Sequence, residues 1–450
     1  MTADPPFLRS PPFPWVDAAT AAVSTPGRSR VADPDTLLAA IAAARVGGAF
    51  WRNCPAAPAE AMRDRIVAAV EAASYRNPFT GATIDPLSAV AILADWRRMI
   101  DANRGIAAAV GIAAWKRPAM AQFLWDGAAS PLFLDADDAI ARAGASGGAV
   151  VYWPSRVGSD FHANASAARV ATWQVEDGFV RSAGLGAECH PPMSVIVDAT
   201  GGAYFDPAAP SLIENILATH DFDAALLVRA ARLRERIVAA RIGKYGVDRG
   251  PAAALPAGRR IVVAIGQVAD DLSVLYGGGA GGMDTFLRRV RAEEPDAHIV
   301  YRPHPDVVAG LRRGASEGLS SVDQVATGGS LLSLIERADA VHVLSSLTGF
   351  EALLRGVPVV VHGTPFYAGW GLTRDLVPAP ARRGRALSID ALTAGALILA
   401  PRYRDPVTEL PCPPEVLVER LANGAAAPMT LLSGFRRALG HTMALGRRRA

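Results

Sequence analysis

Short apolar runs alternate with amphipathic stretches over most of the chain. Residues 149–153 form an apolar run bounded by Gly and Pro, residues 193–197 form another, and residues 168–174 roughly alternate between apolar and polar. Such runs are typical of buried strands. Residues 226–242 place Arg on one face of an apolar, helix-periodic stretch, which predicts an amphipathic helix. The middle of the chain therefore predicts a first block of strands and helices.

A second block begins at residues 260–265, where the run RIVVAI predicts a strand that is buried on both faces, as in a parallel sheet. A Gly-rich turn follows, and then a stretch typical of a helix over residues 283–293. The remaining predicted elements are strands at 298–301, 340–344 and 357–361 and a helix at about 349–355. Two blocks of repeated strand, helix and strand predict an α/β protein with two Rossmann-like domains that face a cleft.

Four segments are expected along the chain. They are an irregular or helical lead-in at 1–74, two Rossmann-like domains at 75–255 and 256–422, and a basic tail at 423–450. The first 35 residues of the lead-in hold many prolines and lack a sustained apolar period, so we expect them to be irregular. The tail carries five arginines among Leu and Met, which suits contact with an anionic membrane surface or, equally, a solvated helix end.

The boundary at residue 75 is based on a short internal sequence repeat. The hexapeptide YRNPFT begins at Tyr75 and YRDPVT begins at Tyr403, 328 residues later, and an apolar helical pattern follows each. That separation has room for a whole module, so the sequence predicts one complete module preceded by the tail end of another. Chance similarity of two short motifs is the alternative interpretation.

Composition and charge disfavour several classes of protein. The 450 residues include 46 basic and 43 acidic side chains, so the net charge of +3 does not favour nucleic acid as a partner. The three cysteines lie far apart without CxxC spacing, which predicts neither disulfides nor a zinc site. The N-terminus lacks the pattern of a signal peptide, and no apolar stretch reaches the roughly 20 residues that span a bilayer. We therefore expect a cytoplasmic protein.

The segment EDGFVRSAGLG follows a predicted strand and holds candidate catalytic residues. Glu176, Asp177 and Arg181 share it with three glycines. In open α/β sheets, ligands bind at the C-terminal ends of strands, and glycines let the backbone approach a ligand closely. A carboxylate beside a cation can stay ionised and act as a nucleophile or a base. The dipeptide Asp-Gly alone is more typical of a turn.

Polar side chains also follow the strands of the second block. Gln267 and Asp270 come after its first strand. In YRPHPD, two prolines hold the backbone extended, so that Arg302 and His304 project in a fixed direction, which suits a phosphate. A histidine at the end of a strand is, however, more often satisfied by its neighbours than used as a ligand.

The segment SSLTGFE lies between a predicted strand and a predicted helix. Ser345, Ser346, Thr348 and Gly349 offer hydroxyls and backbone N–H groups at the start of that helix, which predicts an anion site. Glu351 suits a ribose hydroxyl, or it forms a capping box with Thr348.

A loop rich in aromatic residues and glycines follows, with the sequence GTPFYAGWGLTRD. It contains Gly363 and Tyr367 and is typical either of a loop that folds over a bound ring or of a tightly packed connector. No Walker motif, GxSxG, HExxH or complete GxGxxG accompanies these segments, so hydrolases and enzymes with dinucleotide cofactors are disfavoured.

Taken together, these segments resemble the capsular polysaccharide β-Kdo transferase family, also described as capsule polysaccharide biosynthesis or export proteins. The motifs that carry the resemblance are EDGFVRSAGLG, PPMSVIVD with YFDP, QVADD, YRPHPD, SSLTGFEALLRGVPVVVHG and PFYAGWGLTRD, in the family's order and spacing. The resemblance extends from about residue 75 to residue 422. The best-known members carry two transferase modules, and this chain resembles the second one.

The resemblance implies a bacterial glycosyltransferase of the GT-B kind. Its donor would be CMP-Kdo, bound by residues 256–422, and its acceptor a lipid-linked Kdo facing residues 75–255, with retention at the anomeric carbon. No metal or other cofactor is expected, because a helix N-terminus and basic side chains can meet the phosphate charge of CMP. Peripheral contact with the inner membrane and with capsule assembly proteins is also implied.

The same resemblance assigns roles to residues. Asp177 becomes the candidate catalytic carboxylate, with Glu176 and Arg181 beside it. Contacts to CMP and the sugar fall to Gln267, Asp270, Arg302, His304, Ser345, Ser346, Thr348, Gly349, Glu351, Gly363 and Tyr367. Two positions depart from the family pattern, Ala269 in place of an acid and Arg302 in place of lysine. Two other functions stay open: a transferase of the same fold that uses another sugar nucleotide, and a non-catalytic capsule export or assembly factor.

Overall fold

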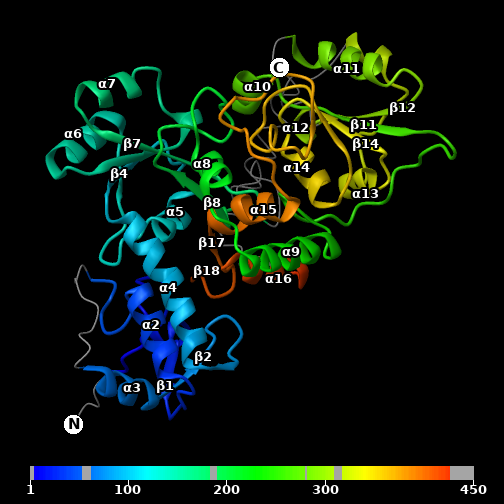
Figure 1. The fold of residues 1–450 in the computed structure, drawn as a ribbon. Coiled ribbons are helices and arrows are strands. Elements are labelled where there is room, and N and C mark those ends of the chain that lie inside the picture. Colours follow the sequence, from blue (N-terminus) through cyan, green and yellow to red (C-terminus); the bar gives the residue numbers. More distant parts are fainter. Residues whose placement is uncertain (1–4, 53–61, 183–189, 279–280, 309–316, 426–450) are drawn as a thin grey trace. The chain divides into compact units, whose positions relative to one another are not determined.

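The computed structural model describes residues 5–52, 62–182, 190–278, 281–308 and 317–425 (Figure 1). These residues form two compact units that divide after Thr172 and after Pro401. The first unit contains the described chain before Trp173 and after Pro401, and the second contains the chain between these points. Within the described ranges, no helix is both long and apolar enough to cross a membrane. The predicted tail lies, beyond residue 425, outside the described residues.

A six-stranded parallel sheet lies in the second unit. Its strands are β11 Ile261–Ile265, β12 His298–Arg302, β13 Gln324–Val325, β14 Ala340–Val343, β15 Val359–Val361 and β16 Arg374–Asp375. They lie in the order β13-β12-β11-β14-β15-β16, which is the order of a doubly wound Rossmann sheet. The strand order reverses between β11 and β14, so a ligand site is expected at the C-terminal ends of these two strands.

Helices cover this sheet and supply much of its core. The helical segments described in the second unit are α8 Leu212–Thr219, α9 Ala224–Ala239, α10 Leu272–Gly277, α11 Gly282–Glu293, α12 Pro305–Val308, η4 Glu317–Ser321, α13 Leu331–Glu336, α14 Leu347–Leu354, α15 Ile389–Thr393 and η5 Ala394–Leu399. Phe286, Leu287 and Val290 of α11 pack against Val262 and Ile299 of the sheet in one buried cluster. Each large apolar side chain buried in this way contributes roughly 1.5–3 kcal/mol.

The elements predicted for the second block are present in the structure. Their ends differ from the predicted ones by two residues or fewer. The helix predicted at 226–242 is α9, which ends earlier, at Ala239. Arg241 has a left-handed backbone (φ 52°), and Ile242 already belongs to a strand.

Two strand pairs position the candidate site. β7, Ala171–Asp177, starts at the boundary between the units and pairs antiparallel with β8, Ser194–Asp198. β9, Ile242–Gly243, pairs antiparallel with β10, Gly246–Val247, and the two residues between them form the turn of a short hairpin. Both β7 and β8 match runs predicted as strands, whereas the short hairpin was not predicted.

The first unit also contains parallel strands, because β4 Ile106–Val110 pairs with both β5 Leu132–Phe133 and β6 Ala149–Tyr152. Its helical segments are α1 Ala18–Ala21, α2 Pro34–Ala44, α3 Arg63–Glu71, α4 Pro86–Asn103, α5 Arg117–Phe123, α6 Ala136–Ser146, η2 Pro154–Arg156, α7 Phe161–Ala167 and α16 Pro414–Ala422. Ile140 and Val150 belong to its buried core. The α/β class is therefore confirmed, whereas a second Rossmann-like domain and a cleft between domains stay predictions.

The short internal sequence repeat corresponds to a repeated local structure. β2 Ala73–Arg76 pairs with β3 Thr83–Ile84, and β17 Pro401–Arg404 pairs with β18 Pro411–Cys412. The register is the same in both hairpins, because Tyr75 lies opposite Ile84 and Tyr403 lies opposite Cys412. A helix that begins with proline follows each hairpin, α4 in the first case and α16 in the second.

The turns of the two hairpins match as well. The side chains of Asn77 and Asp405 each accept hydrogen bonds from backbone N–H groups two and three residues farther on. Both copies lie in the first unit and touch, because Arg420 of α16 donates to Asp405 at 2.9 Å and to the carbonyl oxygen of Phe79 at 2.7 Å. The two hexapeptides therefore form the same local structure, and the interpretation as the ends of two modules stays a prediction.

The prediction that the first 35 residues are irregular is wrong in part. β1, Ser24–Pro26, pairs antiparallel with β2, and Leu8 is fully buried. The ring of Phe13 lies 5.1 Å from the ring of Trp96 and 5.2 Å from that of Trp125. Prolines interrupt the local period of this segment, but partners that are distant in the sequence order it.

Candidate active site

An aspartate and a buried arginine mark the C-terminal end of β7. The Nε of Arg181 donates to Oδ2 of Asp177 at 2.7 Å, and its Nη1 donates to the hydroxyl of Ser182 at 2.8 Å. The Arg181 side chain is 3% exposed, whereas that of Asp177 is 18% exposed. A charge-assisted hydrogen bond of this kind holds the carboxylate in a fixed direction while leaving part of it accessible.

The loop after β7 is tied to the start of β8. Gly178 donates its N–H to the carbonyl oxygen of Ser194 at 3.0 Å, and the Ser194 hydroxyl donates to the carbonyl oxygen of Val180 at 2.6 Å. A Cβ atom at Gly178 would lie 2.3 Å from the Ser194 hydroxyl oxygen, so this close approach requires glycine. Gly178 thus permits close packing against Ser194, and the predicted approach of this loop to a ligand stays a prediction.

A lysine that the sequence analysis missed links this loop to α14. The backbone carbonyl oxygen of Lys244 accepts from the N–H of Arg181 at 2.9 Å. Its N–H donates to Oε1 of Glu351 at 2.9 Å. Lys244 occupies the turn between β9 and β10, and the two hydrogen bonds fix that turn on both sides. A two-residue strand has no hydrophobic period to reveal it in a sequence.

Glu351 is buried and anchors this turn. Burial raises the pKa of its carboxyl group, while the hydrogen bond from the Lys244 N–H and the charges of Arg355 and Lys244 act in the opposite direction. The predicted alternative of a capping box with Thr348 is wrong. Ser346 is the N-cap of α14, since its hydroxyl oxygen accepts from the N–H of Thr348 at 3.2 Å.

Gln267 and Ser345 meet at the point where the strand order reverses. Gln267 follows β11 and Ser345 follows β14, and both are buried. Nε2 of Gln267 donates to the Ser345 hydroxyl oxygen at 3.1 Å, and the N–H of Ser345 donates to Oε1 of Gln267 at 2.9 Å. The structure thus brings two predicted donor-binding residues together at the expected ligand position of the sheet.

The two basic residues of YRPHPD, Arg302 and His304, differ in their surroundings. Arg302 donates to the carbonyl oxygens of Ala326 (3.0 Å), Gly328 and Gly329 (3.1 Å), which follow the edge strand β13. Because β13 and β14 lie on opposite sides of β12 and β11, this guanidinium points away from the switch point. His304 is half-buried and precedes α12, whose Val307 N–H bonds to its carbonyl oxygen.

Asp270 lies at the surface just before α10. It is exposed, and the next residue, Asp271, caps α10 by accepting from the N–H of Ser273 at 2.9 Å. Glu176, the residue before Asp177 on β7, is half-buried. Both acids therefore border the candidate site, and neither is buried within it.

The aromatic loop after β15 is a packed connector. Tyr367 is fully buried, and its hydroxyl donates to the carbonyl oxygen of Ser346. A Cβ atom at Gly349 would lie 2.3 Å from that hydroxyl oxygen, and one at Gly363 would lie 2.2 Å from the carbonyl oxygen of Gly277. Gly349 and Gly363 thus permit close packing, as expected of a packed connector, and the predicted contact of Gly363 and Tyr367 with a bound ring stays a prediction.

Aromatic side chains from four of the motifs form one cluster, here called the aromatic cluster. Phe179 stacks on Phe366 with ring centroids 4.6 Å apart and lies 5.8 Å from Phe350. Tyr204 meets Phe179 edge-on at 5.3 Å. These residues come from EDGF, YFDP, GFEA and PFYAGW, so the motifs singled out in the sequence converge in space.

Electrostatics connect the same residues. Burial raises the pKa of Tyr204 well above its usual value, and the charges of Glu176, Asp271 and Asp177 raise it further. Burial alone would lower the pKa of the Lys244 ammonium group. The interactions with Tyr245, Asp177 and Asp271 outweigh burial and the nearby charge of Arg181, so the pKa of Lys244 is raised.

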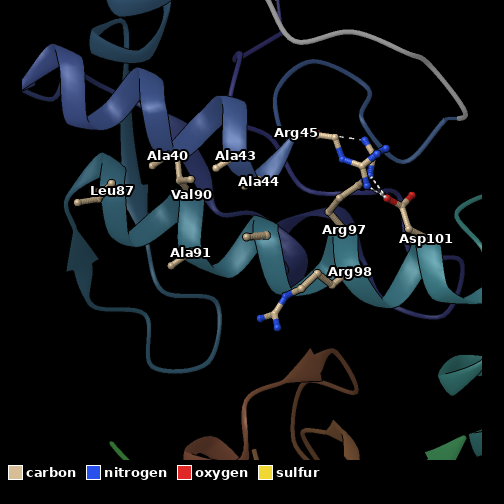
Figure 2. Close-up of a pocket in the computed structure, with 11 residues that line it drawn as sticks. Ala40, Ala43, Ala44, Arg45, Leu87, Val90, Ala91, Arg97, Arg98 and Asp101 are labelled. Carbon is tan, nitrogen blue, oxygen red and sulfur yellow. Dashed lines mark hydrogen bonds and ion pairs between the residues drawn. The ribbon is translucent and has the colours of Figure 1, made fainter. Parts of the chain in front are cut away.

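A groove elsewhere in the molecule contains none of the predicted site residues. Figure 2 shows it in the first unit, between α2 and α4, lined mainly by alanines and Leu87. Its one carboxylate, Asp101, pairs with Arg45 at 2.6 Å and with Arg97 at 2.7 Å. Burial opposes ionisation there, but hydrogen bonds from Arg97 and Arg104 lower the pKa of Asp101, as expected of a structural ion pair.

Among the residues that the structure describes, no group of three or more His, Cys, Asp or Glu side chains is placed to hold a metal ion. Independence from a metal remains a prediction.

Comparison with known proteins supports the sequence resemblance. The chain matches the model of the family described as capsule polysaccharide biosynthesis protein over residues 148–236 and 225–403. All predicted site residues lie in these ranges.

The capsule polysaccharide modification protein LipA of Neisseria meningitidis serogroup A is 36% identical over 364 residues, which make up 78% of this chain and 50% of LipA. The lipopolysaccharide-processing protein LpsZ of Rhizobium meliloti is 43% identical over 242 residues, or 52% of this chain and 54% of LpsZ. The chain thus spans about half the length of the curated relatives it matches.

Two solved structures of Thermosulfurimonas dismutans KpsC are also similar. The chain described as the β Kdo 2,7 transferase gives a TM-score of 0.58 at 31% identity. The chain described as the β Kdo 2,4 transferase gives a TM-score of 0.60 at 30% identity. Each match covers 70% of this chain and 98% of the other, so nearly a whole KpsC transferase structure has its counterpart here.

Proposed function

This chain belongs to the family of capsule polysaccharide biosynthesis proteins, and we propose that it is a glycosyltransferase that moves Kdo from CMP-Kdo onto a Kdo-bearing glycolipid, with retention. The proposal is supported by 30–31% identity to two Kdo transferase structures over nearly their whole length. The observation that carries it is the Asp177–Arg181 pair. The backbone of Lys244, which accepts from the Arg181 N–H and donates to the side-chain carboxylate of Glu351, holds this pair beside α14, which starts at the switch point of a doubly wound sheet.

The donor phosphate is assigned to the N-terminus of α14. The N–H of Ser345 is bonded to Gln267 and that of Thr348 to Ser346, so the phosphate takes the N–H groups of Ser346 and Leu347. The Ser345 hydroxyl accepts from Gln267, which leaves its own proton free to donate. A helix N-terminus carries partial positive charge, and this charge stabilises the CMP leaving group as it gains negative charge.

Asp177 is the proposed catalytic carboxylate. Retention of configuration is compatible with two displacements, in which the carboxylate first forms a bond to the anomeric carbon as CMP leaves and the acceptor hydroxyl then breaks that bond. It is also compatible with a carboxylate that only stabilises the positive charge of the transition state. A mass increase of one Kdo on the peptide that contains Asp177, trapped without acceptor, distinguishes the first role from the second.

The proposal is tested by mass spectrometry of a synthetic Kdo-bearing acceptor incubated with CMP-Kdo. The wild-type protein is expected to add one Kdo, and Asp177→Asn, which keeps the shape of the side chain, is expected to add none. Asp390→Asn is the matched control, because Asp390 forms an ion pair with Arg234 at 2.9 Å in the same unit but outside the site. Transfer from another sugar nucleotide, or equal activity of Asp177→Asn, would refute the proposal; a protein that binds no donor points to a non-catalytic role.

A further inference from the structure

The chain holds only two lysines, Lys116 and Lys244, among its 46 basic residues. Arginine fills the other basic positions, on the surface and in buried ion pairs alike. A lysine is a compact point charge on a flexible stem, whereas arginine presents a broad planar fork. At these two positions the chain therefore carries a compact ammonium charge that its arginines do not provide.

Lys244 is held at the candidate site by its backbone. The N–H group of Arg181 donates to its carbonyl oxygen, and its own N–H donates to Glu351, each at 2.9 Å. Lys244 is half-buried as a residue, and its ammonium nitrogen lies 5.5 Å from the centre of the Tyr245 ring. In the part of the chain that the structure describes, this ammonium forms no ion pair with a carboxylate. Burial lowers the pKa of this ammonium group, but the interactions with Tyr245, Asp177 and Asp271 outweigh burial and raise the pKa, so the group is protonated at neutral pH.

The neighbouring arginines are already engaged. Arg181 is bonded to Asp177 and Ser182, and Arg302 is bonded to three backbone carbonyl oxygens. Arg355 donates to the carbonyl oxygens of Glu351 and Ile242. Among these cations of the described site, Lys244 is the one whose charge is available to a ligand.

We propose that the ammonium group of Lys244 binds the carboxylate of the donor sugar. This inference rests on the proposed function, because it takes the donor to be the nucleotide of a 2-keto sugar acid, whose carboxylate is attached to the anomeric carbon. A second negative charge then lies close to Asp177, and two carboxylates in one site repel each other unless a cation neutralises them. Arg181 is paired with Asp177, and the N-terminus of α14 is assigned to the phosphate. Lys244 supplies the remaining positive charge.

Calorimetric binding of CMP-Kdo and of CMP, without acceptor, tests this assignment. CMP has the phosphate but lacks the sugar carboxylate. Lys244→Met is expected to weaken CMP-Kdo binding about ten- to hundredfold, which is the range for one charge-assisted hydrogen bond, and to change CMP binding less than twofold. Arg249→Met, five residues away and exposed, removes the same charge and is expected to change neither.

Each alternative result overturns the assignment. If Lys244→Met lost affinity for CMP-Kdo and CMP equally, Lys244 would bind the phosphate and not the sugar carboxylate. If its affinity for CMP-Kdo were unchanged, Lys244 would not contact the donor. If the wild-type protein binds no CMP-Kdo, the proposed function itself is refuted. If the wild-type protein transfers Kdo but Lys244→Met binds CMP-Kdo equally well, only this inference is refuted.

Acylation of lysines in the wild-type protein provides a test that does not depend on a variant folding. With two lysines, mass spectrometry follows each one separately, and the buried Lys116 serves as the internal reference. We expect CMP-Kdo to slow acylation of Lys244 at least tenfold and CMP alone to leave its rate unchanged. Equal protection by both ligands, or by neither, would contradict the assignment.

Discussion

Gln267 and Ser345 join the ends of β11 and β14 through two hydrogen bonds, one in each direction, at 3.1 and 2.9 Å. Since an amide can both donate and accept, Gln267 satisfies the backbone N–H of Ser345 and at the same time orients its hydroxyl. The two hydrogen bonds therefore hold the ends of β11 and β14 together at the switch point. The hydroxyl proton of Ser345 stays available to a donor phosphate.

Gln267→Glu is expected to disrupt this arrangement. A carboxylate cannot donate to the Ser345 hydroxyl, so the hydroxyl turns to donate toward Glu and away from the phosphate, which also meets a new negative charge. We expect CMP binding, measured by calorimetry, to weaken at least tenfold. Gln324→Glu, the same change on the edge strand β13, is the control and should leave CMP binding unchanged. Equal binding by both variants would contradict the role given to Gln267.

Arg302 is expected to matter for stability more than for the donor. Its guanidinium holds the three carbonyl oxygens after β13, so Arg302→Ala should lower the free energy of unfolding by about 1–3 kcal/mol. The KM for CMP-Kdo should change less than twofold. Urea unfolding and steady-state kinetics measure the two quantities, with the exposed Arg288→Ala as a control for loss of charge. A raised KM at unchanged stability would instead restore Arg302 as a donor contact.

Much of the sheet in the second unit could be predicted from the sequence for a simple reason. Its strands are buried on both faces, so β11 and β14 are read directly as apolar runs, and the residues that follow them lie at the ligand-binding end of the sheet. Gln267 and Ser345 were found in this way. The repeated hairpins were found because Tyr75 and Tyr403 begin nearly identical motifs.

Other parts of the site could not be predicted, because side-chain direction is set by tertiary contacts. The prolines around Arg302 fix its backbone but not the carbonyl oxygens that its guanidinium reaches. Tyr367 was read as a ligand contact, although the glycine at 349 leaves room for its hydroxyl to bond within the protein. Lys244 lies on a hairpin that is too short to give a periodic signal in the sequence. The scarcity of lysine in the composition was the one available sign that this residue has a special role.

Glu351 is expected to act on the donor by positioning Lys244. Glu351→Gln keeps an oxygen that can accept from the Lys244 N–H, whereas Glu351→Ala leaves that N–H without its acceptor. We expect Glu351→Ala to lose about 1–3 kcal/mol of stability and to bind CMP-Kdo at least fivefold more weakly. Glu351→Gln should stay close to the wild type in both, as measured by urea unfolding and calorimetry. If Glu351→Gln is as damaging as Glu351→Ala, the charge of Glu351, and not its hydrogen bond, is what the site needs.

Two buried histidines should make the protein sensitive to mild acid. Nδ1 of His342 and Nε2 of His362 lie 3.0 Å apart, and both side chains are almost fully buried. Burial is the largest cause that lowers the pKa of His342 to about 4 and that of His362 to about 3, and for His342 the carboxylate of Glu294 only partly opposes it. In the unfolded chain both histidines take up protons near pH 6.5. Protonation therefore favours the unfolded state below that pH.

Stability should accordingly be constant above about pH 6.5 and fall between pH 6.5 and 4, with His342 alone accounting for about 3 kcal/mol over that interval. Urea unfolding between pH 7.5 and 5.5 measures the slope in a range where carboxylates with ordinary pKa values are still almost fully ionised. The double variant His342→Gln/His362→Gln has no titrating group at these positions, so its slope should be clearly smaller, while the exposed His162→Gln should retain the wild-type slope. An unchanged slope in the double variant would mean that the acid sensitivity arises elsewhere in the chain.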